Sequence, residues 1–239
     1  MRVALSLRAV TLDAGGTLIA VAEPVGVTYA RIAARHGLWV SAEAAERGFR
    51  DAFAEAPPLA FPADSPARLR DRERSWWRAI VGRAIGPGPA TALDAAFDEL
   101  FAHYAGAGAW RVYPEVPGTL ATLRARGLRL AVVSNFDGRL APLIDALGVG
   151  HMVDAVVHSS SAGSAKPDSG IFRIALARLG VEPAGALHAG DEPLEDVEGA
   201  RRAGMRALLV DRRRRARALP SGVPVLPSLA ELPAVIGAA

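Results

Sequence analysis

Four short polar clusters interrupt the apolar stretches of this 239-residue chain. Together they would supply a carboxylate, a hydroxyl with an amide, an ammonium and a second acidic group, a set that suits magnesium-assisted phosphoryl transfer. In that chemistry Asp13 would attack phosphorus while Asp191 helps to hold the metal. Ser134 and Lys166 would neutralise the phosphoryl oxygens. The clusters are Asp13-Ala14-Gly15-Gly16-Thr17, Ser134-Asn135, Lys166-Pro167, and Gly190-Asp191-Glu192 with Asp196.

The elements around these clusters predict how they meet. Apolar runs over residues 9–12, 128–133, 153–157, 185–189 and 206–210 indicate buried strands. Helical patterns over 118–126, 139–147, 171–179 and 194–203 lie between the later strands. This alternation predicts an α/β fold with a parallel sheet, a Rossmann-like core covered by helices on both faces. Because each cluster follows a strand, all four should lie at the carboxyl edge, where such sheets bind ligands.

Residues 21–110 differ from the rest of the chain in composition and pattern. Alanine, arginine and glutamate carry apolar residues at helical spacing, and proline and glycine breaks at 57–62 and 86–89 divide the stretch into hairpins. We expect an all-helical domain inserted after the first strand, with the core formed by residues 1–20 and 111–239. Such a cap should close over the site and carry the substrate specificity.

Composition excludes several classes. The chain has no cysteine, which removes disulfides, thiolate metal sites and a cysteine nucleophile. The longest uncharged stretch, 218–230, is too short for a membrane helix, which needs about 18 residues. Arg8 and Asp13 come too early for a secretion signal. We therefore expect a soluble cytoplasmic protein with no membrane partner.

The charge of the chain does not indicate a nucleic-acid partner. The net charge of +3 is small, and the helical block has no basic stripe among exposed aromatic residues, so Trp76 and Trp77 are interpreted as packing residues. The run from Arg212 to Arg215 is interpreted as a solvated loop. Of the 28 basic residues only Lys166 is a lysine, which suggests a place where a compact ammonium is needed.

The four motifs, in this order, resemble the haloacid dehalogenase-like (HAD) superfamily of hydrolases. The stretches LAVVSNFDGRL, SAKPDSGIF and HAGDEPLEDVEGARRAGM are similar to subfamily I, which has an all-helical cap, and SNFDGRL most resembles its branch named REG-2-like or HDHD3-like. The resemblance covers essentially the whole chain. It implies a magnesium-dependent hydrolase acting on a small phosphorylated substrate.

Residue by residue, the resemblance makes Asp13 the nucleophile and Lys166 its catalytic partner. The metal ligands would be Asp13, the backbone carbonyl of Gly15, and Asp191. Phosphate would bind to Thr17, Ser134 and Asn135. Asp196, and less directly Glu192, would orient Lys166 or metal-bound water.

One position departs from the pattern. Phosphatases of the superfamily carry a second aspartate two residues after the nucleophile, as general acid and base, and here that residue is Gly15. General acid–base help contributes about 10²- to 10⁴-fold, so ordinary phosphomonoester hydrolysis should be slow. Glu23 is the nearest substitute in sequence, although a linker glutamate is the simpler interpretation. An acyl phosphate, whose leaving group is good, would need the missing acid less.

Two other interpretations compete. The chain could be a ligand-binding or regulatory module that holds a phosphorylated ligand with little turnover. It could be a 2-haloacid dehalogenase, with Arg31 or Arg35 binding the substrate carboxylate, although Gly15 stands where those enzymes carry an aromatic residue. A phosphonoacetaldehyde-type hydrolase is excluded because the cap has no lysine. His188, inside a strand, is expected to be a packed, hydrogen-bonded core residue.

Overall fold

The computed structural model describes residues 7–61, 65–212 and 222–237, and the chain divides into two compact units. The first comprises residues 1–20, 60–63 and 112–239, and the second 21–59 and 64–111. Two strands carry the chain from one unit to the other, β2 (Ile19–Val21) and β3 (Trp110–Val112), and they pair with each other. Residues 60 and 61, which are predicted to lie in the helical block, group with the first unit, where the Phe61 N–H donates to the Ser160 carbonyl at 3.1 Å.

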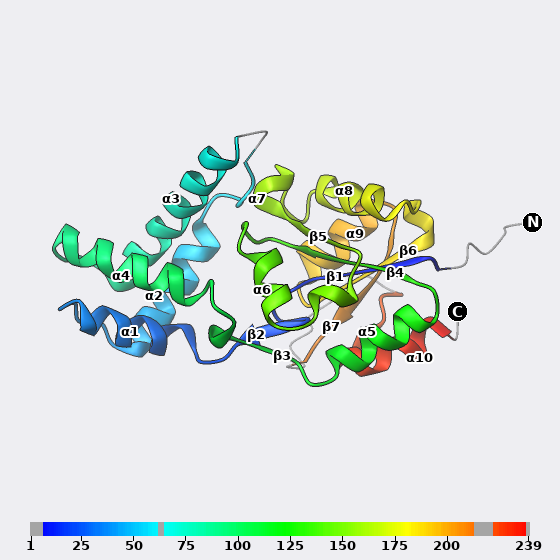
Figure 1. The fold of residues 1–239 in the computed structure, drawn as a ribbon, viewed down its shortest axis with the longest axis horizontal. Helices are drawn as coiled ribbons and strands as arrows, with labels where there is room; N and C mark the ends of the chain where they lie inside the picture. Colours follow the sequence, from blue (N-terminus) through cyan, green and yellow to red (C-terminus); the bar gives the residue numbers. More distant parts are fainter. Residues whose placement is uncertain (1–6, 62–64, 213–221, 238–239) are drawn as a thin grey trace, which may run out of the picture. The chain divides into compact units, whose positions relative to one another are not determined.

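A parallel sheet forms the first unit, in the strand order β5-β4-β1-β6-β7-β8 (Figure 1). The α/β class and the parallel sheet are confirmed. All five strands predicted from the sequence begin and end within two residues of the predicted bounds, whereas the short β8 is not predicted. The strands are β1 (Ala9–Leu12), β4 (Arg129–Ser134), β5 (Ala155–His158), β6 (Ala186–Gly190), β7 (Arg206–Val210) and β8 (Val225–Leu226).

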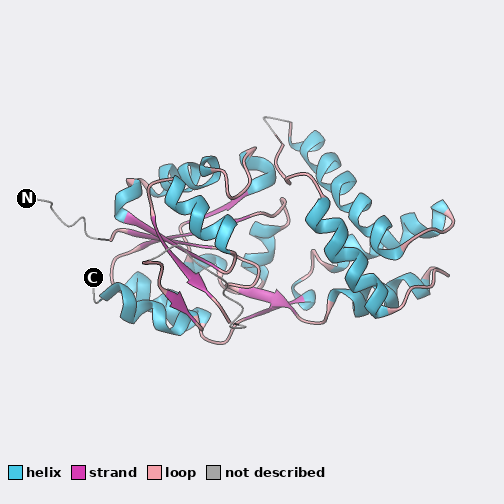
Figure 2. Cartoon of the chain, turned by 180° about the vertical axis from the view of Figure 1, so that it is seen from behind, coloured by secondary structure: helices cyan, strands magenta, loops and turns pink. Residues whose placement is uncertain are grey.

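Helices cover the sheet on both faces (Figures 1 and 2). On one face α8 packs Phe172 and Leu176 against Ala131 and Val133 of β4, and α9 adds Ala200. In α5 the Thr119 hydroxyl donates a hydrogen bond to the Leu229 carbonyl near the C-terminus. The helices of this unit are α5 (Val116–Ala125), α6 (Leu140–Ala146), α7 (Ser159–Ala162), α8 (Ser169–Leu179), α9 (Gly199–Arg202) and α10 (Leu232–Gly237).

The segment after β6 differs from its prediction. A single helix over 194–203 was expected, but a π-helix, Pro193–Glu198, precedes the short α9. Its geometry is stabilised by the side chain of Asp196, which accepts the N–H of Glu192 at 2.9 Å. The π-helix buries Asp196 and Val197 side by side. Such local widening is frequent at functional sites because it re-aims one side chain without ending the helix.

Helices make up the second unit (Figure 2). Ser41 and Ser65 cap two of them by accepting N–H groups three residues further on, and Gly86 ends the longest with φ +90°. An apolar core that includes Tyr29, Ile32 and Phe97 holds the helices together. They are α1 (Val25–Arg35), α2 (Ala42–Glu55), α3 (Pro66–Ile85) and α4 (Ala90–His103). No helix in the described part of the chain is long and apolar enough to cross a membrane.

Candidate active site

Asp13 and Lys166 form the centre of the site at the carboxyl edge of the sheet. Asp13 directly follows β1, in the middle of the sheet, and its N–H donates to the Ala189 carbonyl of β6 at 3.0 Å. Lys166 Nζ donates to Asp13 Oδ1 at 2.6 Å and to Asp196 Oδ1 at 2.5 Å. The side chain of Lys166 is 2% exposed. One ammonium therefore bridges two carboxylates away from water.

The charged groups at this centre shift one another's pKa values. Burial alone would lower the pKa of Lys166, but the charges of Asp13 and Asp196 outweigh it and raise that pKa above its usual value. Burial would likewise raise the pKa of Asp196, yet Lys166 and a hydrogen bond from His188 hold it below its usual range. Lys166 therefore stays an ammonium and Asp196 a carboxylate at neutral pH.

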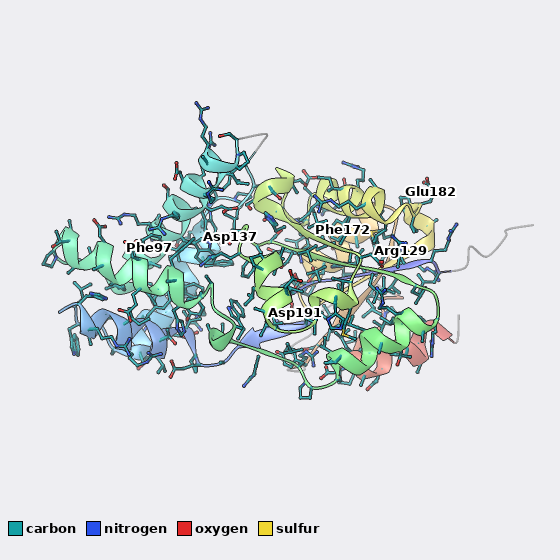
Figure 3. All side chains as sticks on the ribbon, in the orientation of Figure 1. Phe97, Arg129, Asp137, Phe172, Glu182 and Asp191 are labelled. Carbon is teal, nitrogen blue, oxygen red and sulfur yellow. The ribbon has the colours of Figure 1, made fainter. Side chains whose placement is uncertain are left out.

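Asp191, which is labelled in Figure 3 and follows β6, brings a third carboxylate to the cluster. One carboxylate oxygen from each of Asp13, Asp191 and Asp196 lies within 4.8 Å of the others. Burial, reinforced by the charges of Asp13 and Asp196, raises the pKa of Asp191 to about 8. Closely spaced hard oxygen donors with excess negative charge fit a divalent cation such as Mg²⁺. Of the three, Asp13 and Asp191 are the better ligands, because both oxygens of Asp196 already accept hydrogen bonds.

The turn after Asp13 brings the backbone close to Asp191. Gly16 has φ +79°, and a Cβ at this position would lie 2.2 Å from Asp191 Oδ2, so only glycine fits. The fully buried Thr17 donates its hydroxyl to Asp191 Oδ1 at 3.4 Å. Thr17, predicted to bind phosphate, is thus placed against Asp191. Gly15 differs from Gly16, since it is exposed and no atom lies within 4 Å of a Cβ added there.

Asn135 holds the backbone on either side of the Lys166 α-carbon. Its Oδ1 accepts the Lys166 N–H at 2.8 Å, and its Nδ2 donates to the Lys166 carbonyl at 3.0 Å. The same Nδ2 donates to Glu195 Oε2 at 3.0 Å. The amide predicted to bind phosphate is therefore engaged in fixing the lysine loop. Ser134, also predicted to bind phosphate, is 4% exposed at the end of β4.

Two residues hold the Asp196 carboxylate in place by hydrogen bonds. His188 is fully buried, as expected of a core residue, with Nδ1 bonded to Thr11 Oγ1 at 2.8 Å and Nε2 to Asp196 Oδ1 at 3.1 Å. Glu192 acts through its backbone N–H, which donates to Asp196 Oδ2. Of the two acidic residues predicted to orient Lys166, Asp196 contacts the ammonium directly, and the backbone of Glu192 contacts Asp196.

Several residues outside the four motifs also differ from expectation or were missed. Glu23 accepts the Thr28 hydroxyl at 2.6 Å and pairs with Arg31 at 2.8 Å, which holds its pKa low and makes it a poor proton donor. Glu195 is not among the predicted site residues, because nothing in its local sequence sets it apart. Arg212, interpreted as solvated, is instead bonded to the Asp13 turn; residues 213–215 lie outside the described part of the chain.

Comparison with known proteins identifies the family of the chain. A family model for haloacid dehalogenase-like hydrolases matches residues 7–204. The mouse haloacid dehalogenase-like hydrolase domain-containing protein 3 is 39% identical over 209 residues, 86% of this chain and 82% of that protein. Phosphoserine phosphatase of Thermus thermophilus is 39% identical over 143 residues, 59% of this chain and 55% of the enzyme.

The solved structure of L-2-haloacid dehalogenase from Xanthobacter autotrophicus has the same fold, with a TM-score of 0.69 at 21% identity over 97% of this chain and 99% of that one. At this identity the likeness concerns the fold alone. The sequence relationships go further, because they extend over most of the chain and include a phosphatase. The chain therefore belongs to the haloacid dehalogenase-like hydrolase family, as a hydrolase with phosphatase relatives.

Proposed function

We propose that this hydrolase is a magnesium-dependent phosphatase that works through an aspartyl-phosphate on Asp13, with a small phosphorylated molecule as its substrate. The observation that carries the proposal is the bridge from the buried Lys166 ammonium to Asp13 and Asp196, with Asp191 beside it. Asp13, the Gly15 carbonyl and Asp191 would hold the metal. When bound, Mg²⁺ would offset the repulsion between the anionic nucleophile and the anionic phosphoryl group.

The first chemical step belongs to Asp13. A carboxylate oxygen attacks phosphorus, the bond from phosphorus to the leaving oxygen breaks, and that oxygen takes up a proton. Lys166 holds Asp13 Oδ1 in place and, as an ammonium, stabilises charge on the phosphoryl oxygens together with the Ser134 hydroxyl. In the second step water attacks the aspartyl-phosphate, which releases inorganic phosphate and restores the Asp13 carboxylate.

Gly15 restricts the substrates that can react well. It offers no proton to the leaving oxygen, so that proton must come from water, and a good leaving group is favoured. An acyl phosphate meets this condition better than an alkyl phosphate. Gly15 also favours the second candidate, a module that binds a phosphorylated ligand and turns it over very slowly.

Phosphate release with and without Mg²⁺ tests the proposal, with acetyl phosphate and p-nitrophenyl phosphate as substrates. We expect magnesium-dependent release, faster relative to background with acetyl phosphate, which disappears in Asp13→Asn. Asp51→Asn, an exposed change on α2, serves as the matched control and should retain the wild-type rate. If wild type releases no more phosphate than Asp13→Asn from either substrate, the phosphatase proposal fails.

The alternatives give different results in the same preparation. Magnesium-dependent binding of inorganic phosphate without turnover would support the binding module. Chloride release from 2-chloropropionate that requires Asp13 but not Mg²⁺ would support dehalogenation, in which Asp13 attacks carbon instead of phosphorus. Each result identifies one chemistry, because only phosphatase activity requires both the metal and release of phosphate.

A further inference from the structure

Arg212 reaches the nucleophile turn from a different part of the sheet. It lies two residues beyond the end of β7, whereas the turn follows β1, and β6 separates these two strands. Its Nε donates to the carbonyl oxygen of Gly16 at 3.1 Å, and its Nη2 donates to that of Thr17 at 2.8 Å. One guanidinium therefore binds two successive carbonyls of the turn that carries Asp13.

The guanidinium is itself fixed on its other sides. Its Nη1 pairs with Glu115 Oε1 at 2.6 Å, and its plane lies over the Tyr113 ring with 3.6 Å from Cζ to the ring centroid. Glu115 in turn accepts the Ser228 hydroxyl at 3.0 Å. The Arg212 side chain is only 14% exposed. The donors of a guanidinium lie on three nitrogens in one plane, so it reaches two carbonyls and a carboxylate on different sides together, whereas the donors of an ammonium all lie on one atom.

The bonds to Gly16 and Thr17 fall where the turn governs the site. The carbonyl of Gly15, the residue just before Gly16, is one of the proposed metal ligands. Thr17 contacts Asp191 through its hydroxyl, and the backbone of Gly16 lies against the same carboxylate. A shift of this turn would therefore change the spacing of the metal ligands. Displacements of about 1 Å at catalytic groups can lower rates about 10²-fold.

We propose that Arg212 is a positioning residue, which clamps the Asp13 turn so that the metal ligands and the nucleophile keep the geometry that the reaction needs. This inference rests on the proposed function and adds to it a residue outside the four motifs. Arg212 touches neither the substrate nor the reacting atoms. Its effect passes through the Gly16 and Thr17 carbonyls.

Arg212→Lys tests the clamp because it keeps the positive charge but loses the planar fork. Amide hydrogen exchange of residues 16–19 reports on the turn, whose Gly16 and Leu18 N–H groups are bonded within it. We expect faster exchange there, a kcat lower by about 10-fold or more, weaker Mg²⁺ binding and a nearly unchanged KM for acetyl phosphate. Arg124→Lys is the matched control, since Arg124 also donates to a carbonyl and pairs with a carboxylate, away from the turn.

The outcomes separate the clamp from the proposed function. Unchanged exchange of residues 16–19 in Arg212→Lys overturns the inference, and so does faster exchange with unchanged kcat and Mg²⁺ affinity, since Arg212 would then be merely structural. A similar fall in kcat in Arg124→Lys would also overturn it. If the wild type releases no phosphate, the proposed function fails, whereas the clamp is still decided by exchange and Mg²⁺ affinity.

Discussion

Replacing Gly15 by aspartate should raise activity on substrates with poor leaving groups. The position lies two residues after Asp13, is exposed, and has no atom within 4 Å of an added Cβ. The backbone of Gly15 is not in the left-handed region, so an L-residue fits without strain. The new carboxyl would lie two residues along the chain from the Asp13 carboxylate. Like charges favour its protonated form, which is the form a general acid needs.

The size of the gain follows from what a general acid supplies. Proton transfer to the leaving group contributes about 10²- to 10⁴-fold, or roughly 3 to 5 kcal/mol of barrier. An exposed substitution without strain costs less than about 0.5 kcal/mol of stability, so folding should not limit the effect. We expect at least about a 100-fold rise in kcat/KM for an alkyl phosphate and less than about 10-fold for acetyl phosphate.

The assay compares both substrates in wild type, Gly15→Asp and Gly15→Asn. Asparagine has the same shape but no proton to give, so Gly15→Asn should leave both rates near those of the wild type. Equal rises for the two substrates, or an equal rise with asparagine, would show that the change acts by binding and not by proton transfer. No rise in Gly15→Asp for the alkyl phosphate would refute the reasoning.

Three further predictions concern the buried charges. Lys166→Arg should lower kcat at least about 100-fold, because the larger planar guanidinium does not fit where the compact ammonium lies between Asp13 and Asp196, with the Lys166 side chain only 2% exposed. Steady-state rates at saturating Mg²⁺ check this, and a near-wild-type rate would contradict it. Burial raises the pKa of Asp191 to about 8, so Mg²⁺ binding at pH 7 should release about one proton. Calorimetry in two buffers of different ionisation enthalpy measures this proton, and no release would count against the site. Burial raises the pKa of Glu195 to about 7 from an unfolded value of 4.5, so the folded state binds more protons between these values and the free energy of unfolding should fall as pH rises through that window. In urea unfolding with EDTA, that fall between pH 5 and pH 8 should be smaller in Glu195→Gln than in the wild type by about 1 kcal/mol, an amount reduced for the partial exposure of the group. An equal fall in the two proteins would refute the assignment.

The sequence alone determined the fold class and the order of the motifs. Apolar runs that each end in a polar cluster predict parallel strands with chemistry at one edge, and the strand over 9–12 and the strand over 206–210 are found with those bounds. The sequence also singled out Lys166, since the only lysine among 28 basic residues stood apart from composition alone. These features are local, and a local pattern is readable without knowledge of its distant partners.

Only the tertiary structure decided which partner each polar group has. The sequence predicts that Asn135 and Thr17 bind phosphate, and it does not show the hydrogen bonds across 31 and 174 residues that join them to Lys166 and Asp191. Arg212 looks like part of a solvated run, yet it lies 196 residues from the Gly16 carbonyl that it binds. A donor in a folded chain bonds to whatever acceptor the sheet brings within about 3 Å. That choice depends on strand order, which no local pattern encodes.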